Sequence, residues 1–180
     1  LVTGFRQSLA EALDVKREAT GVVDAIVADD IADFPDLNLA ESLQRIPGVA
    51  IDRQAGEGRR VTVRGLGGNF TRVRINGMEG LATTGGSDAS GGTNRSRAFD
   101  FNTFAAELFN ELVVRKTQSA SIEEGSLGAN VELRTAKPFD YGAGWTGSIS
   151  VQGLYNDLIG ETSPRAAGLI SYTNPEDTFG

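Results

Sequence analysis

The sequence reads Asn38-Leu39-Ala40-Glu41-Ser42-Leu43-Gln44-Arg45-Ile46-Pro47-Gly48 near the end of its first quarter, and the fold can be worked out from there. Asn38 stands three positions before Glu41, which is the spacing of a helix-capping box with asparagine in place of serine or threonine. Pro47-Gly48 marks the end of the helix. Three apolar residues fall at i, i+4 and i+7 and share one helical face: Leu39, Leu43 and Ile46.

Short runs that are typical of strands lie on both sides of this helix. We predict strands at residues 49–52 and 61–64, separated by a polar loop at residues 56–58, and a clearly alternating strand at residues 71–75. Asn76-Gly77 favours a type I′ hairpin turn, because both central positions need positive φ, and a short return strand is expected at residues 78–81. Further strands are predicted at residues 22–27 and 130–135.

The region between the return strand at residues 78–81 and the strand at residues 130–135 is less regular. Residues 83–93 are rich in Gly, Ser, Thr and Asp and are expected to form a long flexible loop. A helix is predicted after it, with Asp100 or Asn102 as the cap, and it runs into a strand at residues 112–114. Four residues trace its apolar face: Phe101, Ala105, Phe109 and Leu112. Near the N-terminus, residues 9–19 suit a mobile leader or a marginal helix.

The last forty residues follow a period of two. From Trp145 to Tyr155, the odd positions are apolar with aromatic ends and the even positions are almost all polar. Residues 165–173 repeat the pattern after a predicted loop at residues 156–164. Eleven residues suffice for a tilted strand to cross a bilayer, and aromatic ends match the girdles of outer-membrane barrels. An exposed hairpin of a soluble sheet can alternate in the same way, so both readings stay open here.

Composition excludes several classes of protein. Among 180 residues there is no His and no Cys, which removes disulfides, Cys/His zinc sites and catalytic triads that need an imidazole. The formal net charge of −7 argues against a nucleic-acid partner. The acids gather between residues 11 and 41, whereas residues 59–74 hold five arginines and no acid. This basic stretch is either a solvated face or a strand pair that meets acids on another element.

Five blocks in this order resemble the plug of TonB-dependent outer-membrane receptors, in the proteobacterial type associated with carbohydrate uptake. They are Glu41-Ser42-Leu43-Gln44-Arg45-Ile46-Pro47-Gly48-Val49, Val63-Arg64-Gly65, Ile75-Asn76-Gly77, residues 114–121 and residues 125–131. The resemblance implies an α+β plug domain with a small mixed sheet and short helices, followed by the first two antiparallel strands of a transmembrane β-barrel. The predicted domains are a leader at 1–20 with a remnant of the TonB box, the plug at 21–140, and an incomplete barrel at 141–180, so the chain is expected to be a piece of a longer one.

The resemblance also implies functional residues. Leu1, Val2, Thr3 and Gly4 resemble the end of the TonB box, which pairs with TonB as an extended strand, although an unstructured terminus is the alternative. Arg64 and Lys116 match the cations that meet barrel glutamates, and a strand-end arginine is the alternative for Arg64. Apical plug loops bind the ligand in this family, which suggests five residues unless they only face water: Asn69, Phe70, Asn94, Arg95 and Arg97.

The function expected is therefore that of a component of an active transporter, whose plug gates the barrel and helps to bind a scarce nutrient, with a saccharide as the candidate. The partners implied are TonB with its inner-membrane energy complex, the protein's own β-barrel, a small-molecule ligand and the outer membrane of a Gram-negative bacterium. No catalytic residue, metal site or cofactor is predicted. The alternative is a ligand-sensing signal-transduction module of the periplasm. An enzyme is disfavoured, because the chain has no imidazole and no carboxylates paired in an apolar setting.

Overall fold

The structure is a computed structural model that describes residues 2–27, 38–54, 56–80, 96–104, 106–156, 160–176 and 178–180. The chain divides into two units, Leu1–Thr135 and Ala136–Gly180, which are described separately. Among the described residues, no helix is long and apolar enough to cross a membrane.

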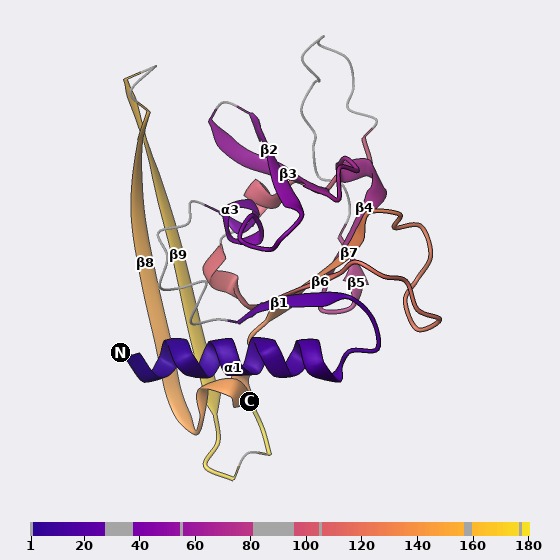
Figure 1. Cartoon of the computed structure of the whole chain (residues 1–180). Coiled ribbons are helices and arrows are strands. Elements are labelled where there is room, and N and C mark those ends of the chain that lie inside the picture. The colour runs from indigo at the N-terminus through magenta and orange to yellow at the C-terminus, as the bar shows by residue number, and fades with distance from the viewer. Residues whose placement is uncertain are drawn as a thin grey trace. The chain divides into compact units, whose positions relative to one another are not determined.

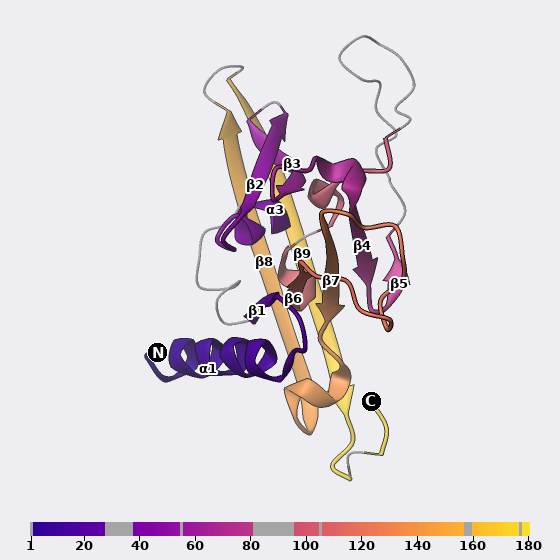
Figure 2. The same ribbon diagram turned by 45° about the vertical axis from the view of Figure 1, so that its right-hand side comes forward.

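The first unit is built on a five-stranded mixed sheet with the strand order β1-β6-β7-β4-β5 (Figures 1 and 2). Its pairs are antiparallel except for β4 and β7, which run parallel. The parallel pair is central, as expected for strands that need cover on both faces. The strands have these bounds: β1 Val23–Val27, β4 Thr71–Ile75, β5 Met78–Glu79, β6 Phe109–Arg115 and β7 Ala129–Thr135.

A second layer covers one face of this sheet. It consists of the helix α3 (Leu39–Leu43), the hairpin of β2 (Val49–Gln54) and β3 (Glu57–Val63), and short 3₁₀ turns. The 3₁₀ turns are η1 (Gly68–Phe70), η2 (Phe101–Thr103) and η3 (Ala106–Leu108). The apolar core lies between the two layers, and its fully buried side chains include Leu39, Leu43, Phe101, Leu112 and Leu133.

The helix α1 (Val2–Glu18) packs against β1 (Figure 1). In α1, Ser8 is buried, whereas Leu9 and Leu13 are exposed. A helix was one of the two states expected for the leader. Val2, Thr3 and Gly4, which resemble the end of the TonB box, lie in α1 and are not extended here, and Leu1 lies outside the described residues.

Most of the predicted elements are confirmed. Asn38 caps α3, and its side chain accepts hydrogen bonds from the backbone N–H groups of Ala40 and Glu41 at 3.0 and 3.3 Å. Asn76 and Gly77 have φ values of 50° and 82°, as the type I′ turn requires. The loop predicted at residues 83–93 lies outside the described residues.

The helix predicted from Phe101 to Leu112 is wrong. Phe101 begins the 3₁₀ turn η2, with Asp100 as its cap, and Phe109 already begins β6. The strand predicted at residues 112–114 is confirmed as part of β6, which is buried on both faces there, so that Leu112, Val113 and Val114 are consecutive core residues. A continuous apolar run fits a central strand as well as a helix, and the β-branched pair favours the strand.

The second unit is a hairpin of two long strands, β8 (Gly144–Asn156) and β9 (Glu161–Thr173), preceded by the 3₁₀ turn η4 (Pro138–Tyr141). The two strands pair in one unbroken antiparallel register from Gly144 with Thr173 to Asn156 with Glu161. The loop predicted at residues 156–164 is therefore too long. Pro164 stays in the strand opposite Gly153, because each strand of a two-stranded sheet has an open edge, where proline is tolerated.

Candidate functional sites

Arg64 occupies a strained position in a tight turn directly after β3. Its φ is 53°, in the left-handed region that a residue with a side chain adopts at a cost of about 1 kcal/mol or more. Val63 and Leu66 close the turn with two reciprocal backbone hydrogen bonds of 3.0 Å, and Gly65 supplies the second positive φ, 78°. Arg64 is thus a turn residue and not part of the predicted strand.

The exposed side chain of Arg64 joins two segments of the first unit. Its Nη2 donates to the carbonyl oxygens of Gly128 at 2.8 Å and Leu127 at 3.3 Å, and its backbone N–H donates to Gly48 at 2.8 Å. Nη1 and Nε have no partner among the described residues. Arg64 therefore supports the turn before β7 while keeping part of its guanidinium available.

Lys116, the other cation predicted to face the barrel, is buried within the first unit. Its Nζ donates to Asp24 Oδ2 at 2.6 Å and to the carbonyl oxygen of Pro47 at 2.6 Å. Asp24 Oδ1 also accepts from Lys16 of α1 at 2.7 Å. Lys116 thereby connects the end of β6 to β1 and to the turn after α3, and Asp24 extends the connection to α1.

The pKa of Asp24 lies below its ordinary value of 3.8. Burial by itself raises the pKa of this carboxyl, but hydrogen bonds and charge attraction from Lys116 and Lys16 together outweigh that effect. Asp24 is therefore a carboxylate at neutral pH, and it holds two ammonium groups at the base of α1.

A further ion pair was missed at the residue level by the sequence analysis. Arg59 Nη2 lies 2.5 Å from Asp100 Oδ2, and the carboxylate of Asp100 is almost fully buried. Arg72 likewise pairs with Glu79 at 2.7 Å and with Glu123 at 3.3 Å. Of the two alternatives for the basic stretch, contact with acids on other elements is therefore what Arg59 and Arg72 show.

The predicted ligand residues fall into three groups. Asn94 and Arg95 lie outside the described residues. Asn69 Oδ1 accepts hydrogen bonds from Ser96 Oγ at 2.7 Å and from the backbone N–H of Arg97 at 2.9 Å, so this side chain anchors residues 96 and 97 to η1. Phe70 and Arg97 are exposed, and Phe70 leaves 47% of its surface open to solvent.

An open groove of about 760 Å³ lies between Phe70 and the segment that joins β6 to β7. The sequence analysis proposed only Phe70 from this groove. Most of the remaining lining residues fall in the family blocks at residues 114–121 and 125–131, Ile122 and Glu124 lie between these blocks, and none of them carried a separate signal. They are Gln118, Ser119, Ala120, Ile122, Glu124, Gly125, Ser126 and Leu127.

Among the described residues, no group of three or more His, Cys, Asp or Glu side chains could hold a metal ion. The polar side chains of the first unit described so far form ion pairs and caps that connect its elements. These ionic contacts hold the first unit together, and the groove beside Phe70 lies on its surface.

A mixed sheet with a covering layer, followed along the chain by a hairpin of two long strands, defines an α+β globule and a separate antiparallel hairpin. The chain belongs to the TonB-dependent receptor plug domain family, whose model matches residues 15–130. This family agrees with the fold expected from the five sequence blocks.

Solved structures show the same fold. A single-residue variant of the ferric enterobactin receptor PfeA from Pseudomonas aeruginosa has a TM-score of 0.67 and 25% identity over 90% of this chain and 23% of its own length. The siderophore receptor PirA from Acinetobacter baumannii has a TM-score of 0.67 and 23% identity over 89% of this chain and 23% of its own. The copper transporter OprC has a TM-score of 0.58 and 16% identity over 86% of this chain and 22% of its own.

The chain thus spans about 23% of the length of the receptor structures that it matches. Among curated protein sequences, none matches it. The three proteins are named for ferric enterobactin, for a siderophore and for copper, so their names do not agree on one ligand.

Proposed function

We propose that this chain is the plug and the first two barrel strands of a TonB-dependent transporter in the outer membrane of a Gram-negative bacterium. The observation that carries this proposal is the family match over residues 15–130, followed along the chain by a hairpin of two 13-residue strands. The plug gates the barrel and helps to bind a scarce nutrient that is moved by energy from TonB. The activity is transport, so no bond is made or broken.

The hairpin supports the membrane part of this proposal. Strands of 13 residues are long enough to cross a bilayer when tilted. Large apolar side chains at alternate positions of β8 are highly exposed within this unit, and the rings of Trp145 and Tyr172 lie 4.9 Å apart near one end of the hairpin. The exposed apolar residues of the two strands are Trp145, Ile149, Val151, Tyr155, Ile170 and Tyr172. Lipid would cover such a face.

The contacts with partners are part of the proposal. Arg64 suits a contact with a barrel glutamate, because it is exposed and two of its three guanidinium nitrogens are without a described partner. Lys116 is a weaker candidate, since its ammonium already bonds Asp24 and Pro47. The segment from Leu1 to Gly4 would pair with TonB only after Val2, Thr3 and Gly4 leave the helical conformation of α1.

The saccharide stays our candidate nutrient, on the strength of the sequence blocks. Asn69, Phe70, Asn94, Arg95 and Arg97 remain the proposed apical ligand residues, although Asn69 also has a structural role in holding residues 96 and 97.

The test is genetic. We expect deletion of the gene region that encodes this chain to abolish accumulation of one radiolabelled nutrient, and loss of TonB to have the same effect. Neutral oligosaccharides and ferric siderophores are the two classes to compare. Uptake that persists without the chain, or without TonB, contradicts the proposal.

A further inference from the structure

We propose that the groove between η1 and the segment joining β6 to β7 is a binding site for a neutral sugar ring, with Phe70 and Leu127 as its apolar walls and Glu124 as its hydrogen-bond acceptor. This inference deepens the proposed function, on which it rests, by giving the saccharide a site and narrowing it to neutral sugars. The groove volume of about 760 Å³ falls within the range of small-molecule pockets.

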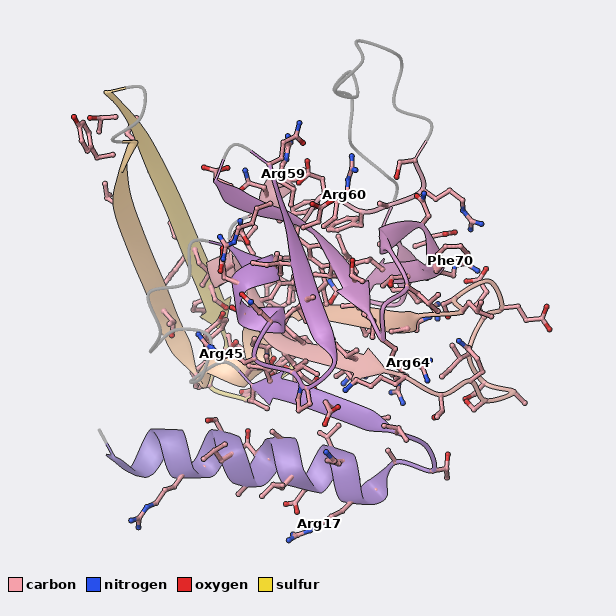
Figure 3. The ribbon with its side chains drawn as sticks, turned by 45° about the horizontal axis from the view of Figure 1, so that its top comes forward. Arg17, Arg45, Arg59, Arg60, Arg64 and Phe70 are labelled. Carbon is pink, nitrogen blue, oxygen red and sulfur yellow. The ribbon has the colours of Figure 1, made fainter. Side chains whose placement is uncertain are left out.

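The walls of the groove are apolar and open. Phe70 exposes 47% of its surface and Leu127 exposes 69%, although both border the same hollow. A ligand that covers them removes apolar surface from water, and an aromatic ring offers a flat platform with a negative face to the C–H groups of a sugar. Figure 3 shows Phe70 on the side of the first unit where the β6–β7 segment lies.

The groove is held in shape before any ligand arrives. Gly128 N–H donates to the Phe70 carbonyl at 2.8 Å and joins the two walls, and Arg64 holds the carbonyls of Leu127 and Gly128 from behind. Gln118 Nε2 donates to Ser126 Oγ at 2.8 Å across the base of the segment. A preformed site loses less conformational freedom when it binds, which favours affinity.

The charge of the groove selects against anions. Glu124 is the one ionisable residue among those that line it. The nearby cation Arg72 is not available to a ligand, because it pairs with Glu79 and Glu123 and donates to the Glu124 carbonyl. An anionic ligand would therefore meet an uncompensated carboxylate, whereas a neutral one would not.

Glu124 also provides the polar contact that a sugar needs. Its carboxylate has no partner among the described residues, so it can accept hydrogen bonds from two hydroxyl groups, and bonds to an ionised acceptor are the stronger kind. Ser119 lines the same groove with a hydroxyl that now bonds only to Ser121, at 2.9 Å. Apolar walls with a few polar groups are the usual composition of a small-molecule site.

The experiment is isothermal titration calorimetry of the full-length chain in detergent against four probes. Three are neutral trisaccharides, namely maltotriose, cellotriose and xylotriose, and the fourth is the anionic trigalacturonate. We expect at least one neutral probe to bind. Phe70→Ala should weaken that binding by about tenfold, and Phe70→Tyr should restore it because the ring returns. Glu124→Gln should weaken the binding of the neutral probe several-fold and strengthen the binding of trigalacturonate.

Met78→Ala is the matched control, because Met78 is exposed to 71% on β5 and does not line the groove. The proposal is overturned if no neutral trisaccharide binds, if trigalacturonate binds better than all three, or if Phe70→Ala and Met78→Ala have equal effects. Nutrient uptake that still depends on the chain and on TonB would then leave the transporter function standing. Uptake that depends on neither would refute that function, whatever the groove binds.

Discussion

Lys116 Nζ and Asp24 Oδ2 lie 2.6 Å apart, at a point where side chains from β1 and from the end of β6 meet below the turn that follows α3. The side chains of Lys116 and Asp24 are exposed to only 9% and 15%, whereas Lys16, the second partner of Asp24, is exposed to 55%. The two ion pairs of one carboxylate thus differ in burial, and their contributions to stability should differ accordingly.

We expect Lys116→Met to lower the free energy of unfolding by about 2–4 kcal/mol, because it leaves a buried carboxylate and the Pro47 carbonyl with one partner fewer. Lys16→Met should cost at most about 1 kcal/mol, since an exposed ion pair is weak. Hydrogen exchange of the β1 and β6 amides measures both effects. Equal losses for the two variants would show that burial does not decide the strength of these pairs.

The same carboxylate predicts a pH dependence. The pKa of Asp24 is lower in the folded chain than the ordinary 3.8, so its contribution to stability is present above pH 3.8 and is lost as the pH falls through the lower, folded-state pKa. The stability difference between the wild type and Asp24→Asn should therefore be constant between about pH 5 and pH 7 and shrink in more acidic solution. Urea titrations across this range give the difference in free energy of unfolding. A difference that becomes larger on acidification would contradict the lowered pKa.

Local patterns predicted the strands and turns of the fold well, because period-two alternation and the Asn76-Gly77 pair act within a few residues. For β6 they predicted a strand only at residues 112–114 and a helix before it, because a strand buried on both faces has no alternation to separate it from a helix. The apolar spacing from Phe101 to Leu112 therefore indicated the wrong element.

The sites depend on contacts that no local pattern contains. Arg64 reaches Gly128, 64 residues later, and Lys116 reaches back 69 residues to Pro47. Sequence analysis selected Arg64 and Lys116 only through the resemblance to a family. That resemblance does not say that Lys116 forms a buried ion pair with Asp24. The groove was missed because Phe70 and Leu127 come together only through the parallel pairing of β4 with β7.

The turn at Arg64 can be tested through its glycine. Gly65→Ala should cost about 1–2 kcal/mol of stability, because the φ of 78° is strained for any residue with a Cβ atom. Gly67 is the control, since its φ is −62° and a Cβ there meets nothing within 4 Å. Gly67→Ala should be neutral or stabilise by up to about 1 kcal/mol. Thermal unfolding of both variants compares the two, and a destabilised Gly67→Ala would refute this account.

The proposed membrane face of β8 predicts a defect in assembly. Ile149→Arg places a charge on the exposed apolar face and should disfavour insertion by about 2–4 kcal/mol if lipid covers that face. The fraction of the chain recovered in the outer membrane, compared with the wild type, measures the effect. Glu176→Arg also adds positive charge but lies in the exposed turn after β9, so it should assemble normally. Normal assembly of Ile149→Arg would place this face away from lipid.

The junction between α1 and β1 depends on a glycine that has no space for a side chain. A Cβ on Gly21 would lie 2.1 Å from Thr117 Oγ1, the atom that accepts a hydrogen bond of 2.9 Å from the Val22 N–H. Gly21→Ala must therefore displace the Thr117 hydroxyl and leave that N–H without its partner, at a cost of about 1–2 kcal/mol.

In a Thr117→Ala background the added methyl group meets no hydroxyl, and the same substitution should cost less than about 0.5 kcal/mol. A double-mutant cycle, read from the exchange rate of the Val22 amide, gives the coupling between residues 21 and 117. A coupling near zero would mean that the Thr117 contact contributes nothing that Gly21→Ala could remove, and that the packing of the helix and the Lys16–Asp24 ion pair join α1 to β1.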